Sequence, residues 1–260
     1  MTETFTKEDG NTELWHTIFA VGHPDLSAQQ SFHARLPRDP RCKLCKAPFA
    51  GLGGLYMRFR GKAPSRRNKN YCNACDGFLD AFPGGAEVGM SVLFADIRNS
   101  TAFAETAGPK AASDRVNRFL DAATKSITDN DGFILAFYGD CIVAVWPPGF
   151  SGPDHARMAL TAAREIAADA RSGAGAVPVG VGVHMGKVYI GTVQAAKGLF
   201  RDVSIFGVEV NVTARLAAAA AAGEALASKV LIAAAGVGAG EMRSLDLKGI
   251  SRPVEAAALA

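Results

Sequence analysis

The sequence has no apolar run long enough to cross a bilayer. Its first nine residues have neither the basic start nor the apolar stretch of a signal peptide. With 48% apolar residues, 260 residues suffice for one large domain, or for a medium domain and a small one. The sequence therefore predicts a soluble, cytoplasmic protein without a membrane segment.

Acidic residues are absent between residues 41 and 70, a segment that holds nine lysines and arginines. The net charge of +3 is too small to indicate nucleic-acid binding by itself, and the rest of the chain is slightly acidic. A basic stretch in this segment is a candidate site for an anion, a nucleic acid or a regulatory partner. Its members are Arg58, Arg60, Lys62, Arg66, Arg67 and Lys69. The alternative is a solvated loop that keeps the segment soluble.

Cysteine is also scarce, with five residues in the chain, and four of them form two C-x2-C pairs. The pairs are Cys42 with Cys45 and Cys72 with Cys75. Four thiolates at this spacing suit a tetrahedral structural Zn²⁺, and a cytoplasmic protein favours metal ligation over disulfides. An iron–sulfur cluster and redox disulfides are the alternatives. Because the surrounding segment has little apolar core, the metal would supply much of its folding free energy.

The sequence divides at Phe82-Pro-Gly-Gly85, a break in the pattern. Residues 1–85 are predicted to form a small module with the four-cysteine zinc site, and residues 86–260 a larger domain of alternating strand and helix patterns. The predicted elements are a strand at 88–96, a helix at 110–128, a hairpin at 133–138 and 141–146, a helix at 155–170, a hairpin at 179–185 and 188–193, a helix at 208–222, and short strands near 225 and at 244–247. This order indicates an α+β fold, an antiparallel-rich sheet covered by helices.

Two aspartates, Asp96 and Asp140, each follow an apolar strand at a tight turn. Carboxylates on neighbouring strands suit hard cations such as Mg²⁺ or Mn²⁺. Two such ions can clamp a triphosphate and activate a hydroxyl nucleophile. Taken singly, Asp96 also fits a helix N-cap and Asp140 an ordinary hairpin turn.

Five motifs in series resemble the catalytic domain of class III nucleotidyl cyclases over residues 88 to 257. They are Phe94-Ala-Asp-Ile-Arg-Asn-Ser-Thr101, Tyr138-Gly-Asp140, Gly182-Val-His-Met-Gly-Lys-Val-Tyr-Ile-Gly191, Phe206-Gly-x-x-Val-Asn-Val-Thr-Ala-Arg-Leu216 and Leu247-Lys-Gly249. The resemblance implies a ferredoxin-like core and a head-to-tail homodimer with active sites shared between its subunits. It implies that a nucleoside triphosphate becomes a 3′,5′-cyclic nucleotide and pyrophosphate.

The resemblance also assigns roles to residues. It makes Asp96, Asp140 and the carbonyl of Ile97 the ligands of two Mg²⁺ or Mn²⁺ ions per site. The turn that meets the phosphates comprises Arg98, Asn99, Ser100 and Thr101, where a helix start favours an anion.

From the opposite subunit, the resemblance implies that Asn211 orients the ribose and Arg215 stabilises charge on the α-phosphate. These two residues lie four apart and so share a helix face. Lys248 matches the lysine that reaches the terminal phosphates. A solvated helix face, and a charge at a strand end for Lys248, are the alternatives for each residue alone.

The positions that read the base depart from the family pattern. Adenylyl cyclases of the family usually carry Lys where this chain has Ala136, and often Asp or Thr where it has Ser204; guanylyl cyclases usually carry Glu and Cys. An alanine side chain makes no hydrogen bond, so a contact to adenine is missing. Three interpretations remain: an ATP cyclase with relaxed base recognition, a pyrimidine cyclase resembling those of anti-phage defence that make cyclic CMP or cyclic UMP, or an inactive relative. The complete metal, ribose and phosphate set argues against the third.

Four further residues stand near these motifs, and the sequence suggests a structural role for each of them. Phe137 and Tyr138 flank the base-reading position and either fill space beside a smaller base or belong to the core. Cys141 is expected to be a buried strand residue that points away from Asp140. His184 is expected to be a satisfied core or interface histidine.

The leading hypothesis is thus a cyclase with Mg²⁺ or Mn²⁺ in its active site and a structural Zn²⁺. The competing hypothesis is a zinc-dependent nucleic-acid or protein sensor, in which the cyclase-like domain only dimerises.

Overall fold

The computed structural model describes residues 11–37, 39–172, 176–195, 200–238 and 240–259. The first nine residues, on which the prediction about a signal peptide rests, lie outside this range. Within it, no helix combines the length and apolarity that a membrane crossing requires. The chain forms two compact units. The cysteine unit comprises Met1–Val88 and Tyr189–Ile205, and the sheet unit comprises Gly89–Val188 and Phe206–Ala260.

The cysteine unit contains short helices that the sequence pattern did not reveal. They are α1 (Thr12–His16), the π-helix η2 (Thr17–Val21), α2 (Pro24–Ala34), α3 (Gly51–Phe59) and α4 (Asn73–Ala81). Trp15 is fully buried, stacks on Phe19 at 5.4 Å between ring centroids, and donates a hydrogen bond to the Phe82 carbonyl. These helices are too short to show a clear period, so their stability comes from packing and from the cysteine cluster.

The same unit includes the outer part of strand β4 (Val179–Ala195) and most of strand β5 (Phe200–Phe206), which pair with each other. This is a correction, because a hairpin was predicted around Gly186-Lys187 and β4 runs straight through it. Gly186 does not have the positive φ of a tight turn. A Cβ atom at this position would lie 2.5 Å from the Cγ atom of Glu209, so close packing explains the glycine.

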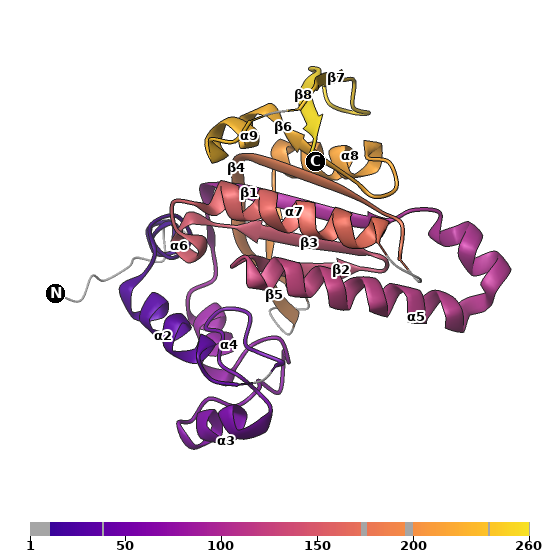
Figure 1. The fold of residues 1–260 in the computed structure, drawn as a ribbon. Helices are drawn as coiled ribbons and strands as arrows, with labels where there is room; N and C mark the ends of the chain where they lie inside the picture. The colour runs from indigo at the N-terminus through magenta and orange to yellow at the C-terminus, as the bar shows by residue number, and fades with distance from the viewer. Residues whose placement is uncertain (1–10, 38, 173–175, 196–199, 239, 260) are drawn as a thin grey trace. The chain divides into compact units, whose positions relative to one another are not determined.

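The sheet unit is built on a sheet of strand order β2-β3-β1-β4-β6-β8-β7 (Figure 1). Its strands are β1 (Gly85–Ile97), β2 (Phe133–Tyr138), β3 (Cys141–Trp146), the inner part of β4, β6 (Glu224–Ser228), β7 (Met242–Leu245) and β8 (Val254–Ala258). Strand β3 pairs antiparallel with β1 and β2, whereas β4 pairs parallel with β6. The predicted strand near 88–96 and the hairpin at 133–146 are confirmed, as is the antiparallel-rich α+β class.

Helices cover both faces of this sheet. The helices are α5 (Ser100–Asp129), α6 (Pro148–Ser151), α7 (His155–Arg171), α8 (Val208–Ala219) and α9 (Lys229–Ala235). Along β6, Ala225 and Ala227 pack in the core under α5, α7 and α9, whereas Leu226 packs in a second core with α8. Since alternate strand residues point to opposite faces, α8 covers the face opposite to α7. It ends at Ala219 rather than at 222, because Ala220 turns to extended backbone and is buried.

Candidate active site

The two aspartates come together at one end of the paired strands β1 and β3. Asp96 lies opposite Cys141 in the antiparallel register, so Asp140 directly adjoins that pair. The amide of Ile97 donates a 3.3 Å hydrogen bond to the carbonyl of Asp140, which ties the two strand ends. Gly139 has φ 63°, a conformation that glycine adopts readily, and this closes the tight turn before Asp140.

The electrostatics of this pair indicate a cation site. Burial and, second, the neighbouring Asp140 carboxylate raise the pKa of Asp96, while Arg98 at 3.5 Å opposes the rise. Like charges at close range destabilise each other, and a divalent cation between them removes the repulsion. The carboxylates therefore fit a Mg²⁺ or Mn²⁺ site, to which Ile97 can add only a backbone carbonyl.

The turn after Asp96 leads into helix α5, as the phosphate-binding prediction requires. Asn99 has φ 55° and precedes the first helical residue, Ser100. The first amides of a helix have no partner inside the helix, so those at this start face outward as anion donors. Helix α5 is kinked at Gly108, whose φ of 84° is not helical, and the predicted helix at 110–128 is its second part.

Arg98 differs from its three neighbours in this turn. Its amide donates a 2.7 Å hydrogen bond to the Pro178 carbonyl, and its guanidinium donates to the carbonyl of Ala217 in α8. Only 19% of its side chain is exposed. Arg98 therefore joins the end of β1 to α8, and the amides left for a phosphate belong to Asn99, Ser100 and Thr101.

The predicted ribose and phosphate residues form a second group. Asn211 and Arg215 both lie on the exposed face of α8, whose other face buries Val212 and Leu216. Lys248 is exposed and follows Leu247, which packs in the same small core as those two residues. Among the described residues, no hydrogen bond or ion pair joins this group to Asp96 or Asp140.

The base-reading positions belong to different units, Ala136 on β2 to the sheet unit and Ser204 on β5 to the cysteine unit. Both are half-buried. Phe137 and Tyr138 are 51% and 62% exposed, so the alternative that placed them in the core is wrong for the single chain. Both rings lie at the end of β2, next to the turn at Gly139 and Asp140.

Cys141 and His184 lie in different surroundings. Cys141 is half-buried rather than buried, and as the cross-strand partner of Asp96 it shares that residue's face of the sheet. Burial, with Asp96 and then Asp140 adding to it, raises its pKa to about 12, so the thiol stays protonated. His184 is buried and bonded to Ser228 and Glu209, each at 2.7 Å, which confirms a satisfied histidine.

The four predicted zinc ligands form one cluster within the cysteine unit. The Sγ atoms of Cys42, Cys45, Cys72 and Cys75 all lie within 4.8 Å of one another. The Sγ atoms of Cys45 and Cys72 are 3.7 Å apart, close to the separation of about 3.8 Å that tetrahedral ligation at about 2.3 Å requires. All four are free thiols in this structure, and no disulfide joins them.

The surroundings of the cluster also suit a metal. The Cys72 amide donates to the Cys42 sulfur at 3.2 Å, and the ammonium of Lys62 lies 3.9 Å from the Cys45 sulfur. Neighbouring sulfurs, and then burial, raise the pKa of Cys42. Four thiols this close cannot all ionise unless a cation balances them, so the cluster fits a bound metal ion.

The basic stretch near the cluster is mostly exposed to solvent. Arg67 pairs with Asp76 and Asp80, so it is a structural residue. Arg58, Arg60, Arg66 and Lys69 are exposed. Arg67 is exposed as well, at 46% of its side chain, and of the six basic residues Lys62 alone is half-buried, so the solvated loop stays an alternative.

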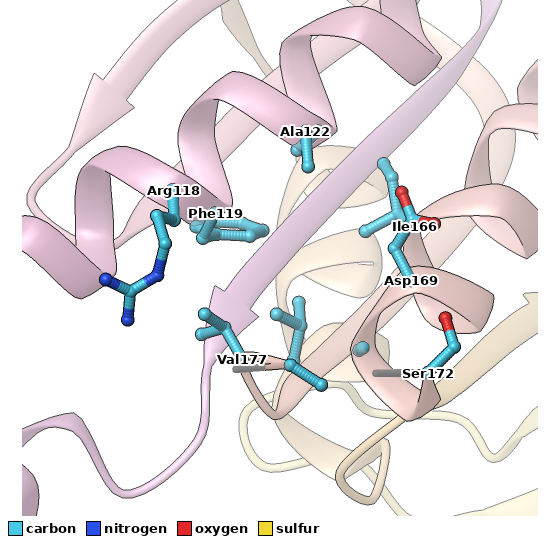
Figure 2. Close-up of a pocket in the computed structure, with 11 residues that line it drawn as sticks. Arg118, Phe119, Ala122, Ile166, Asp169, Ser172 and Val177 are labelled. Carbon is cyan, nitrogen blue, oxygen red and sulfur yellow. The ribbon is translucent and has the colours of Figure 1, made fainter. Parts of the chain in front are cut away.

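A cavity of about 290 Å³ lies elsewhere, between α5, α7 and the start of β4 (Figure 2). Its lining includes Phe119 and Ile166, which belong to the main core, and Arg118 and Asp169 at its edge. None of the predicted site residues belongs to its described lining. It is a gap between core helices, not the site of the predicted chemistry.

A family profile and known proteins match much of the chain. The profile of the family described as the adenylate and guanylate cyclase catalytic domain matches residues 86–237. An adenylate cyclase of Anabaena cylindrica is 32% identical over 134 residues, which are 49% of this chain and 26% of that protein. Adenylate cyclase 1 of Rhizobium meliloti is 26% identical over 135 residues, 49% of this chain and 20% of that protein. The chain thus spans about a quarter or less of these two relatives.

Solved structures cover the domain more fully. The adenylyl cyclase CyaB from P. aeruginosa is 26% identical with a TM-score of 0.57, covering 68% of this chain and 96% of that one. The guanylyl cyclase Cya2 has the same identity and TM-score, covering 67% and 93%. Both show the class III fold that the motifs predicted. With more than half of its residues inside the family profile, the chain belongs to the adenylate and guanylate cyclase catalytic domain family.

Proposed function

We propose that this chain converts a nucleoside triphosphate into a 3′,5′-cyclic nucleotide and pyrophosphate, as a head-to-tail homodimer with shared active sites. One observation carries the proposal. Asp96 and Asp140 meet at the ends of two paired strands, where the Asp140 carboxylate helps to raise the pKa of Asp96, in a chain of the cyclase family. The same pair in an unrelated fold would indicate only a metal site.

Asp96, Asp140 and the carbonyl of Ile97 are the proposed ligands of two Mg²⁺ or Mn²⁺ ions. The donor set contains only oxygen, which suits these hard cations. When bound, the ions lower the pKa of the ribose 3′-hydroxyl and balance the charge of the phosphates. The amides of Asn99, Ser100 and Thr101 hold the phosphates at the start of α5.

The residues on α8 complete the site from the other subunit. Asn211 orients the ribose, Arg215 stabilises the charge that develops on the α-phosphate, and Lys248 holds the terminal phosphates. All three are exposed in the single chain, which leaves them available to a substrate held by a second copy. A shared site also explains why no contact joins them to Asp96 among the described residues.

Two candidate classes of base are each supported by an observation. The relatives from Anabaena cylindrica and Rhizobium meliloti are adenylate cyclases, which favours ATP and cyclic AMP, although the similar solved structures include the guanylyl cyclase Cya2. The methyl group of Ala136 offers no hydrogen bond, and the exposed rings of Phe137 and Tyr138 lie next to it, which favours a pyrimidine triphosphate and cyclic CMP or cyclic UMP. A role in anti-phage signalling would follow from the second product.

Product identification tests the function and the base together. The purified protein is incubated with all four triphosphates in competition, with Mn²⁺, and the cyclic products are separated by mass. Asp96→Asn is expected to lose at least about 100-fold in rate, because it removes a charged ligand from the reacting centre. Asp129→Asn, which alters an exposed helix-end ion pair with Lys125, is the control and is expected to keep full activity. Equal rates for Asp96→Asn and the wild type would contradict the metal assignment.

For the cysteine cluster we propose one structural Zn²⁺ per chain. Free clustered thiols and Zn²⁺ ligation fit the reducing cytoplasm, where we place the protein. Metal analysis of the purified protein is expected to give about one zinc per chain. Iron in place of zinc would indicate a cluster of the iron–sulfur type.

We also assign the exposed face of α3 to a regulatory partner. Leu52, Leu55 and Phe59 are 80%, 67% and 89% exposed at helical spacing, and the neighbouring Arg58 and Arg60 are exposed too. Apolar side chains bordered by cations suit a partner with an acidic rim around an apolar surface.

The competing function is a sensor in which the cyclase-like domain only dimerises. The exposed arginines and the face of α3 are the features that favour it. It predicts no cyclic product from any triphosphate at high protein concentration, together with an intact dimer.

A further inference from the structure

The cysteine unit holds the strand that carries one of the two base-reading positions. We define the β4–β5 ribbon as residues 189–195 and 200–205, which group with the N-terminal residues in one compact unit. Ser204 lies on this ribbon, between the buried residues Val203 and Ile205. The position of Ser204 therefore depends on what the ribbon packs against.

Asp202 is the centre of the polar contacts that hold the ribbon. The hydroxyl of the fully buried Tyr71 donates a 2.5 Å hydrogen bond to its Oδ1 atom, and the ammonium of Lys43 lies 3.5 Å from its Oδ2 atom. The amide of Val203 donates to Asp202 Oδ1 at 2.8 Å and is 3.4 Å from the Tyr71 hydroxyl. The backbone just before Ser204 is thus fixed by two side chains.

Arg201 makes a second set of contacts. Its guanidinium pairs with Asp80 at 2.6 Å, although only 8% of the side chain is exposed, and Asp80 also pairs with Arg67. Its carbonyl accepts a 2.9 Å hydrogen bond from the Asn68 side chain. Because the Arg201 side chain is almost fully buried, a shift of its half-exposed partner Asp80 would leave a buried charge unpaired.

The two residues that hold Asp202 adjoin the predicted zinc ligands. Lys43 directly follows Cys42, and Tyr71 directly precedes Cys72. The amide of Lys43 donates a 2.9 Å hydrogen bond to the Asn70 carbonyl, which joins the two cysteine loops. A metal that fixes the sulfurs of Cys42 and Cys72 also fixes the backbone positions from which the Lys43 and Tyr71 side chains extend.

We infer that the cysteine unit is a brace for base recognition, in which Tyr71 and Asp202 are positioning residues for Ser204. The inference rests on the proposed cyclase function and assigns a task to the zinc module within it. Metal in the four-cysteine cluster fixes the position of Tyr71, and the hydrogen bond from Tyr71 fixes the position of Asp202. Asp202 in turn fixes the backbone of the strand that presents Ser204 to the base. Loss of these contacts changes which triphosphate the protein prefers.

Tyr71→Phe is the sharpest variant, because it removes one hydroxyl and keeps the buried ring. Tyr56→Phe is the matched control, since it removes a hydroxyl from α3 in the same unit. Within the described residues, that hydroxyl accepts a hydrogen bond from the exposed Arg60 and makes no hydrogen bond to the ribbon. Both variants, as full-length protein, are first checked for zinc content and thermal unfolding. Amide hydrogen exchange is then followed over residues 200–206, with and without a chelator.

The expected result for Tyr71→Phe is exchange faster by about tenfold at residues 200–206 with zinc retained, the effect of one lost hydrogen bond. Chelation of the wild type is expected to have a larger effect at the same residues. The ratio of kcat/KM between the best and second-best triphosphates is expected to change by at least about threefold, mainly through KM. Tyr56→Phe is expected to match the wild type in all three measurements.

Unchanged exchange at residues 200–206 in Tyr71→Phe would overturn the inference. Faster exchange with an unchanged triphosphate ratio would also overturn it, because the unit would then support the fold without positioning Ser204. If the wild type makes no cyclic product, the cyclase proposal fails and the base-recognition inference fails with it. The exchange data would still show whether the brace itself exists.

Discussion

The two units of the molecule obtain their stability in different ways. The sheet unit has a continuous apolar core, in which side chains such as Leu93, Leu160 and Trp146 are fully buried. The cysteine unit buries fewer apolar residues and instead gathers four thiols and two ion pairs that each have one buried partner, Asp76 with Arg67 and Arg201 with Asp80. The sheet unit is therefore expected to fold without metal, whereas the cysteine unit is expected to need it.

Removal of a zinc ligand is expected to have the largest effect. Cys45→Ser should abolish zinc binding and destabilise the cysteine unit by more than about 4 kcal/mol, because metal binding is part of its folding free energy. Hydrogen exchange should show loss of protection at residues 41–81 and retained protection in β1 and β3. Cys141→Ser, which lies outside the cluster, should keep the zinc. Loss of protection in both units at once would show that the two do not differ as described.

A substitution in the apolar core is expected to destabilise the sheet unit and to leave the cysteine unit intact. Leu160→Ala in α7 removes a fully buried side chain and should destabilise the sheet unit by about 2–5 kcal/mol. Zinc content should stay at about one per chain. Hydrogen exchange in β1 and β3 measures the response of the sheet unit, and zinc release measures that of the cysteine unit. Simultaneous loss of zinc and sheet structure would indicate one cooperative unit.

Acid provides a smaller test of the sheet unit. Burial lowers the pKa of His184 despite its bond to Glu209, so the folded state binds this proton less readily than the unfolded state. A depressed pKa contributes stability above the unfolded value of about 6.5, and that stability is lost as the pH falls through that value towards the folded pKa. His184→Gln should make unfolding free energy less dependent on pH between about 7 and 5, by at most about 1.4 kcal/mol per pH unit. An unchanged slope would mean that His184 does not titrate on unfolding.

Much of the sheet unit was predictable because its patterns are long and local. Alternation marked β1 and the β2–β3 hairpin, and helical spacing marked α7 and α8. Gly186 misled the prediction, because a glycine required by the nearby Glu209 looks the same in sequence as a turn glycine. The helices of the cysteine unit were missed because they are short and their burial depends on distant residues.

The candidate site shows the same limit. The meeting of Asp96 and Asp140 was predictable, since Asp96 lies at the end of β1 and Asp140 directly precedes β3, which pairs with β1. The engagement of Arg98 with the Ala217 carbonyl was not, because 119 positions separate them along the chain. The contacts of Tyr71 and Lys43 with Asp202 are also long-range, so no local pattern could show that the zinc module reaches the base-reading strand.

The central claim is a cyclase whose active site needs two copies of the chain. Asp96→Asn and Arg215→Ala are each expected to be inactive alone, because they disable opposite halves of the site. Mixed in equal amounts, they should regain about a quarter of wild-type cyclic-nucleotide formation, since half of the dimers are mixed and each mixed dimer has one intact site of two. No recovery in a mixture shown to exchange subunits would contradict the shared site, and full activity of either variant alone would contradict the catalytic assignment.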